Sequence, residues 1–135
     1  MLFRSSSSNN IWSAIAATTG NTYDTGDMIV DASSTDKDVL NIAASIDVTA
    51  VPTVTNVETV NVNLDAITTT DTDFAFAATN IGGKTTFNFD NVAAVTAINS
   101  LTVTGLNASE TVNVSNDFSI VSLRSEEHTS ELQSH

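Results

Sequence analysis

Aspartate is the residue type in this chain best suited to chemistry, and it gathers in short polar stretches between apolar runs. Calcium prefers several oxygen ligands from carboxylates, amides and backbone carbonyls, and such stretches supply them. We therefore expect calcium to be the cofactor if the protein has one, although no stretch has EF-hand spacing. The candidate ligands are Asp24, Asp27 and Asp31, then Asp36 and Asp38, then Asp71 and Asp73.

The carboxylates in turns and the Cys and His content of the chain argue against catalysis. General acid and base chemistry needs two carboxylates held in a cleft with shifted pKa values, whereas an aspartate in a turn usually caps backbone donors. The chain has no Cys, and its two His, His128 and His135, lie in the last eight residues. A cysteine nucleophile is thus excluded and a Ser-His-Asp triad would depend on the C-terminal tail. We predict that the protein is not an enzyme.

Apolar segments with period two must position the polar stretches. In Val57-Glu-Thr-Val-Asn-Val-Asn-Leu64, Val60, Val62 and Leu64 share one face, which is typical of a half-buried strand. Its central words, Glu-Thr-Val-Asn-Val, return from Glu110 to Val114. We expect Glu58 and Glu110 to lie at the mouths of these strands and to accept hydrogen bonds from the backbone or from Thr.

The other expected strands recur about every ten residues. They cover 28–30, 39–43, 46–50, 54–64, 74–76, 85–90, 101–104, 110–115 and 118–123. Segment 11–15 fits one helical turn as well as a strand. Pro52 has no N–H for a ladder and is expected at a strand start, an edge or a corner. Gly82-Gly-Lys-Thr85 lacks the upstream glycine of a phosphate loop and is predicted to be a hairpin turn.

This pattern predicts an all-β fold, and more specifically a β-solenoid-like stack of short strands whose outward Thr and Asn side chains form ladders. A β-sandwich of the immunoglobulin-like kind is the alternative. The repeat spacing of 52 residues between Glu58 and Glu110 and the lack of a strict rung length argue against the solenoid.

The charge and the hydropathy of the chain limit the kinds of partner that it can be expected to have. The net charge is −12 and only 15% of residues are charged. A phosphate backbone would be repelled, so nucleic acid is not an expected partner. No segment has the roughly 18 apolar residues that a spanning helix needs, so no membrane span is expected.

Segments 38–42, 54–62 and 101–105 resemble the β-strand repeats of bacterial surface-layer proteins, which are secreted proteins often associated with calcium-binding repeat-in-toxin modules. The resemblance implies a structural, extracellular role at the bacterial cell surface, with copies of the chain or neighbouring repeats as partners in a lattice. The Gly-Gly-x-Gly-x-Asp calcium motif of those modules is absent. Two alternatives stay open: an adhesin or phage-fibre module that contacts glycans or a host surface, and a carbohydrate-active β-helix enzyme.

Both ends of the chain differ in composition from its middle. Residues 124–134 resemble the in-frame translation of a widely used sequencing adapter, and residues 2–5 resemble that of its partner adapter. We therefore predict three parts: adapter-derived residues 1–5, a fragment of a larger β-repeat protein over 6–123, and adapter-derived residues 124–135.

Overall fold

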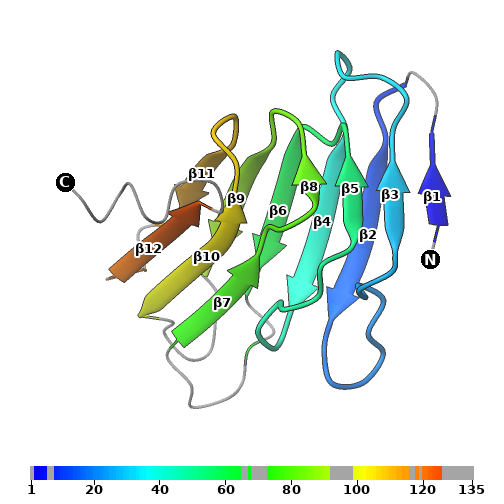
Figure 1. The fold of residues 1–135 in the computed structure, drawn as a ribbon. Helices are drawn as coiled ribbons and strands as arrows, with labels where there is room; N and C mark the ends of the chain where they lie inside the picture. The colour runs from blue at the N-terminus through cyan, green and yellow to red at the C-terminus, as the bar shows by residue number, and fades with distance from the viewer. Residues whose placement is uncertain are drawn as a thin grey trace.

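The fold is a coil of parallel β-strands (Figure 1). The computed structural model describes residues 2–5, 8–64, 67, 73–91, 99–115, 118 and 120–125. Every strand pairing among them is parallel, and these residues contain no helix. The result is a β-solenoid of about four turns. The all-β solenoid prediction is confirmed, and the sandwich, which is built from antiparallel sheets, is wrong.

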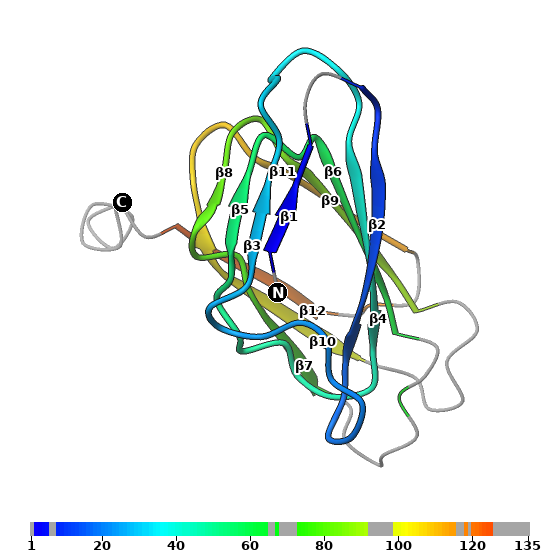
Figure 2. The ribbon, with the colours of Figure 1, turned by 90° about the vertical axis from the view of Figure 1, so that its right-hand side faces the viewer.

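Three sheets form the walls of the solenoid, and each turn is called a rung below. Sheet A contains β1 (Leu2–Arg4), β3 (Met28–Val30), β5 (Thr53–Thr55) and β8 (Ile81–Gly82). Sheet B contains β2 (Ile11–Ala16), β4 (Val39–Ala44), β6 (Thr59–Asn63), β9 (Thr86–Asp90) and β11 (Thr111–Val114). Sheet C contains β7 (Asp73–Ala77), β10 (Ser100–Leu106) and β12 (Ile120–Ser125). Viewed along the stack, the sheets enclose a three-sided core (Figure 2).

The rungs differ in length, which explains why the sequence shows no strict repeat. In sheet B, Ile11 pairs with Val39, and the next three offsets between in-register residues are 20, 27 and 25. The repeated Glu-Thr-Val-Asn-Val words occupy β6 and β11, with β9 between them. Their spacing of 52 residues is therefore two rungs.

Because the apolar residues alternate with polar ones, the inward-facing residues of successive rungs stack in register as apolar columns. Val60 and Val62 are buried in β6, and they stand in register with Phe87 and Phe89 in β9. Phe76 of sheet C meets both rings edge-on, with centroid distances of 5.7 and 5.3 Å. Burial of such side chains is worth about 1.5–3 kcal/mol each, so this aromatic cluster, which spans two neighbouring rungs, anchors the core.

Several predicted strands have different bounds. Segment 54–64 is two strands, β5 and β6, because the chain turns a corner at 56–58. Segment 46–50 is not a strand, and Val48 only bridges to Phe76. Segment 11–15 lies in strand β2 rather than in a helical turn, and Pro52 directly precedes β5 as expected. Gly82-Gly-Lys-Thr85 is not a hairpin, since it joins β8 of sheet A to β9 of sheet B.

Gly105 allows β10 to turn within its length, a feature that the sequence pattern missed. Its φ of 76° is in the left-handed region, and an added Cβ would lie 2.7 Å from the backbone nitrogen of Thr79. No other residue type fits there without moving the neighbouring rung.

The two ends of the chain stand differently in the structure. Residues 2–4 form β1, which pairs in parallel with β3 (Figure 1). Residues 126–135, which hold most of the second predicted adapter segment, lie outside the described residues. The adapter origin of both ends stays a prediction.

Candidate functional site

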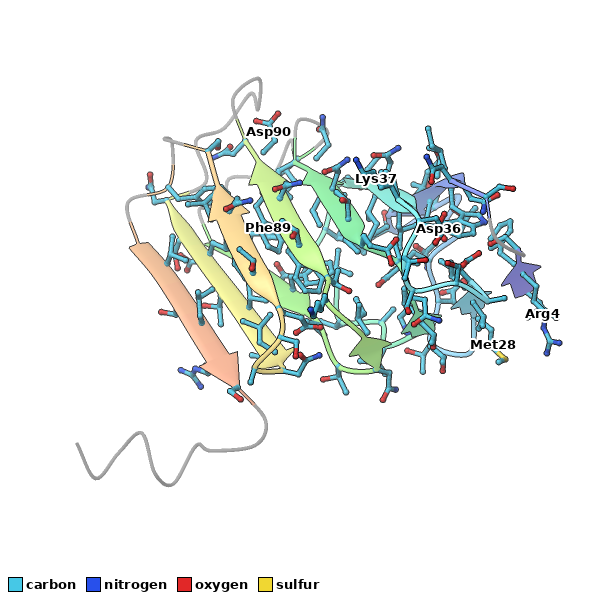
Figure 3. All side chains as sticks on the ribbon, turned by 90° about the horizontal axis from the view of Figure 1, so that it is seen from above. Arg4, Met28, Asp36, Lys37, Phe89 and Asp90 are labelled. Atoms are coloured by element: carbon cyan, nitrogen blue, oxygen red, sulfur yellow. The ribbon has the colours of Figure 1, made fainter. Side chains whose placement is uncertain are left out.

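A hollow with a volume of about 870 Å³ lies over the outer face of sheet B. Outward side chains of β2, β4, β6 and β9 form its floor, and Asp90 is the one carboxylate among the described lining residues. Figure 3 shows Asp90 on the outside of β9, whereas its neighbour Phe89 points between the sheets. The hollow thus offers amides and apolar carbons but no second carboxylate for acid and base chemistry.

An amide ladder runs along this floor. Each asparagine donates from Nδ2 to the Oδ1 of the preceding rung, at 2.9 Å from Asn61 to Asn41, 2.8 Å from Asn88 to Asn61 and 3.0 Å from Asn113 to Asn88. Ser13 continues the same column in β2. Because the amides bond to each other, they hold the rungs in register and keep only part of their hydrogen-bonding capacity for a ligand.

A second polar column stands where the chain turns from sheet A into sheet B. The position before each sheet B strand is occupied by Asn10, Asp38, Glu58, Thr85 and Glu110. The carboxylates of this column accept N–H groups of corner residues: Glu58 Oε2 from Asp38 at 2.8 Å and Glu110 Oε2 from Asn107 at 2.7 Å. The predicted role of Glu58 and Glu110 at strand mouths is therefore confirmed.

The corner between β3 and β4 holds a cluster of three carboxylates, Asp31, Asp36 and Asp38, called the acidic corner below. One oxygen from each lies within 4.8 Å of the others. Asp31 and Asp38 are 1% and 0% exposed, and Asp36 is half-buried. Asp36 and Lys37 mark this corner in Figure 3.

Backbone donors fix two members of the acidic corner. Asp38 Oδ1 accepts the N–H of Asn10 at 2.7 Å, and Asp31 Oδ2 accepts the N–H of Ser33 at 2.5 Å. Asp31 Oδ1 also accepts the hydroxyl of Ser5. Asp38 Oδ2 and both oxygens of Asp36 are buried without a hydrogen-bond partner.

Opposite pKa shifts reflect these surroundings. Burial, followed by the charge of Asp31 and that of Asp36, raises the pKa of Asp38 above its usual range. The Ser5 hydroxyl, helped by the N–H of Ser33, lowers the pKa of Asp31 despite its burial. Hydrogen-bond donors therefore outweigh burial at Asp31, whereas burial and the neighbouring charges outweigh the Asn10 donor at Asp38.

The structure divides the predicted calcium ligands. It brings Asp31 together with Asp36 and Asp38, but Asp24 and Asp27 lie in the turn before β3, where Asp27 Oδ2 accepts the N–H of Asp24 at 2.8 Å. The remaining two candidates are Asp73, which is exposed at the start of β7, and Asp71, which lies outside the described residues.

Another buried polar group was not predicted from the sequence. The Tyr23 side chain is 1% exposed, and its hydroxyl has no hydrogen-bond partner. Burial and the nearby charge of Asp27 raise the pKa of this phenol. In the sequence, the only indication of this buried hydroxyl is that Tyr23 directly precedes the Asp24–Asp27 turn.

No family model, curated protein or solved structure matches the chain. Among the residues that the structure describes, no helix is long and apolar enough to cross a membrane.

Proposed function

We propose that the protein is a structural, non-catalytic segment of a secreted bacterial cell-surface scaffold of the surface-layer kind. Its role is to extend a solenoid by stacking against a further turn, from a second copy of the chain or a neighbouring repeat. The outward Thr and Asn columns of sheet B then provide polar surface for lateral contacts.

The exposure of inward-facing side chains on the last rung carries this proposal. Val121 and Leu123 of β12 are 40% and 50% exposed, and Val114 of β11 is 38% exposed. They stand in register with the buried residues Leu101, Val103 and Phe89, respectively. A parallel rung placed on β11 and β12 would cover these side chains and pair the open strand edges.

The amide ladder supports the same stacking. It ends at Asn113 on one side of the stack, and its column begins with Ser13 on the other. The Asn113 amide has hydrogen-bonding capacity left for a hydroxyl or amide of a neighbouring turn. Stacked copies would thus continue both the core and the ladder.

Two observations weigh against the alternatives. An adhesin would use exposed aromatic side chains, but Tyr23 is buried and Trp12, the only Trp, packs partly buried against the core. A β-helix glycosidase needs two carboxylates across a groove, and Asp90 stands alone in the described lining of the sheet B hollow.

Sedimentation velocity of the full chain over a range of concentrations tests the stacking. We expect association that increases with concentration, and we expect Val121→Thr with Leu123→Thr to shift the protein towards monomers. Ile46→Thr is the matched control, because Ile46 is 36% exposed just after β4, which lies inside sheet B rather than at an end of the stack. A wild-type chain that stays monomeric at every concentration, or a control that disrupts association equally, would contradict the proposal.

A further inference from the structure

The acidic corner combines three features that a structural turn does not need. It is long, with residues 31–38 between β3 and β4, it concentrates three carboxylates, and it buries two of them almost completely. A turn that only caps backbone donors uses each carboxylate as an acceptor. Here three carboxylate oxygens are buried without a partner: Oδ2 of Asp38 and both oxygens of Asp36.

The partnered oxygens orient the carboxylates. The N–H groups of Asn10 and Ser33 bind Oδ1 of Asp38 and Oδ2 of Asp31 from outside the cluster. Asp38 is further fixed through its own N–H, which donates to Glu58 in the next rung. The partners Asn10, Ser33 and Glu58 lie in three successive corners, so Asp31 and Asp38 are held in place without the ligand that the remaining oxygens require.

We propose that Asp31, Asp36 and Asp38 bind one calcium ion. Oxygens that share a calcium ion at 2.3–2.6 Å can be at most about 4.6–5.2 Å apart, and the three carboxylates lie within 4.8 Å of one another. An irregular loop suits the variable coordination of calcium better than the strict octahedron of magnesium. Water would fill the positions that the carboxylates leave.

The charge of the cluster favours a divalent cation over the two other possible neutralising groups. Within the described part of the chain, no Lys or Arg is ion-paired with any of the three carboxylates, and Lys37 is exposed. A proton shared between two of them would leave two negative charges in the corner. A calcium ion would leave one, next to the backbone donors already described.

All three ligands come from residues 31–38. None of the proposed ligands therefore lies in residues 2–5, from which Ser5 contributes only the hydroxyl that Asp31 accepts. It goes beyond the scaffold role, because calcium binding is measured on a single chain whether or not copies stack.

Isothermal titration of calcium chloride into the chelator-treated full chain tests this site. We expect binding of one calcium ion and a melting temperature that rises with calcium concentration. Asp36→Asn should weaken calcium binding by about tenfold or more, since affinity depends on the number of charged ligands. Asp36 accepts no hydrogen bond in the described structure, so this variant leaves the corner otherwise intact.

Asp38→Asn provides a second variant, because its amide oxygen can still accept the N–H of Asn10. Asp24→Asn is the matched control, because Asp24 is exposed in the turn at the other end of β3. Loss of binding in both corner variants with an unchanged control supports the site. The proposal is overturned if the wild-type chain neither binds calcium nor gains thermal stability at millimolar calcium, or if Asp24→Asn weakens binding as much as Asp36→Asn.

Discussion

Two corners join the same pair of sheets one rung apart, and they are built differently. The long corner, residues 31–38, connects β3 to β4, and the short corner, residues 56–58, connects β5 to β6. Both corners leave sheet A and enter sheet B at the same positions. Val30 and Thr55, the last strand residues before the corners, are in register, and so are Val39 and Thr59, the first strand residues after them. The extra residues of the long corner include Asp36.

The short corner satisfies its own polar groups. The Asn56 amide donates to the carbonyl oxygen of Asp31 at 3.1 Å, its backbone N–H donates to Gly82 at 3.3 Å, and Glu58 accepts the N–H of Asp38. Asn56 has a φ of 55°, which lets three residues complete the turn. The long corner instead leaves carboxylate oxygens unpartnered. The comparison teaches that the solenoid can close this corner with the single carboxylate of Glu58, so the three aspartates of the long corner call for another explanation.

Exchanging the corners should have the largest effect. Replacing residues 31–38 by Asn-Val-Glu, the sequence of the short corner, removes the three aspartates, leaves a single glutamate carboxylate and should abolish the calcium response. At calcium a hundred times above the dissociation constant, the lost stabilisation would be about 2.7 kcal/mol. Chemical denaturation with calcium and with chelator measures it. A calcium-dependent stability that survives the exchange would place the ion elsewhere.

Removing the acceptor that links the two corners should have the next largest effect. Glu58→Ala leaves the N–H of the buried Asp38 without its partner, and the free energy of unfolding should fall by about 2 kcal/mol. Glu58→Gln keeps an acceptor oxygen and is the control, with an expected loss of less than about half as much. Equal losses in the two variants, measured by urea denaturation, would mean that the charge of Glu58 matters rather than its hydrogen bond.

The left-handed residue of the short corner gives a smaller effect. Asn56→Ala should cost about 1 kcal/mol, because alanine is disfavoured at a φ of 55° and cannot donate to Asp31. Asn56→Gly restores the backbone conformation but not the amide, so it should recover part of the loss. If the glycine variant is no more stable than the alanine variant, the amide hydrogen bond carries the contribution of Asn56.

Local sequence patterns predicted the strands, but contacts between rungs determine where the corners lie and which residues meet there. The alternation of Val60 and Val62 fixed which face is buried, and the repeated Glu-Thr-Val-Asn-Val words marked two strands of one sheet. Val57 is also buried but is three residues from both Val54 and Val60, so the period-two pattern breaks at the corner between β5 and β6. The prediction of one strand over 54–64 overlooked this break. Glu58 could be placed at a strand mouth because it directly precedes the repeated words.

The acidic corner was only partly predictable. Residue types alone identified Asp31, Asp36 and Asp38 as candidates but gave Asp24 and Asp27 equal weight. What separates the two groups is register: Asp38 lies in a column between Asn10 and Glu58, and those partners are 28 and 20 residues away in the chain. Unequal rung lengths hide that neighbourhood from any fixed repeat.

Substituting Tyr23 should have the smallest effect on stability at neutral pH. Comparing Tyr23 with Asp38 separates the effect of a buried charge from the effect of burial alone. Like Asp38 it is buried with an unpartnered oxygen, but its phenol is neutral and needs no ion. Tyr23→Phe removes the unpartnered hydroxyl and should raise the free energy of unfolding by up to about 1 kcal/mol near pH 7.

The pKa of Tyr23 is raised above the ordinary value of 10.0. The stability of the wild-type chain is therefore unaffected by this phenol below pH 10 and falls as the pH rises further, because the unfolded phenol ionises first. The wild-type chain should therefore lose stability relative to Tyr23→Phe above pH 10, whereas the calcium response at neutral pH should be the same in both. Parallel stability curves through pH 11 would show that Tyr23 is already solvated in the folded chain, and burial at this end of β3 would then be less complete than at the acidic corner.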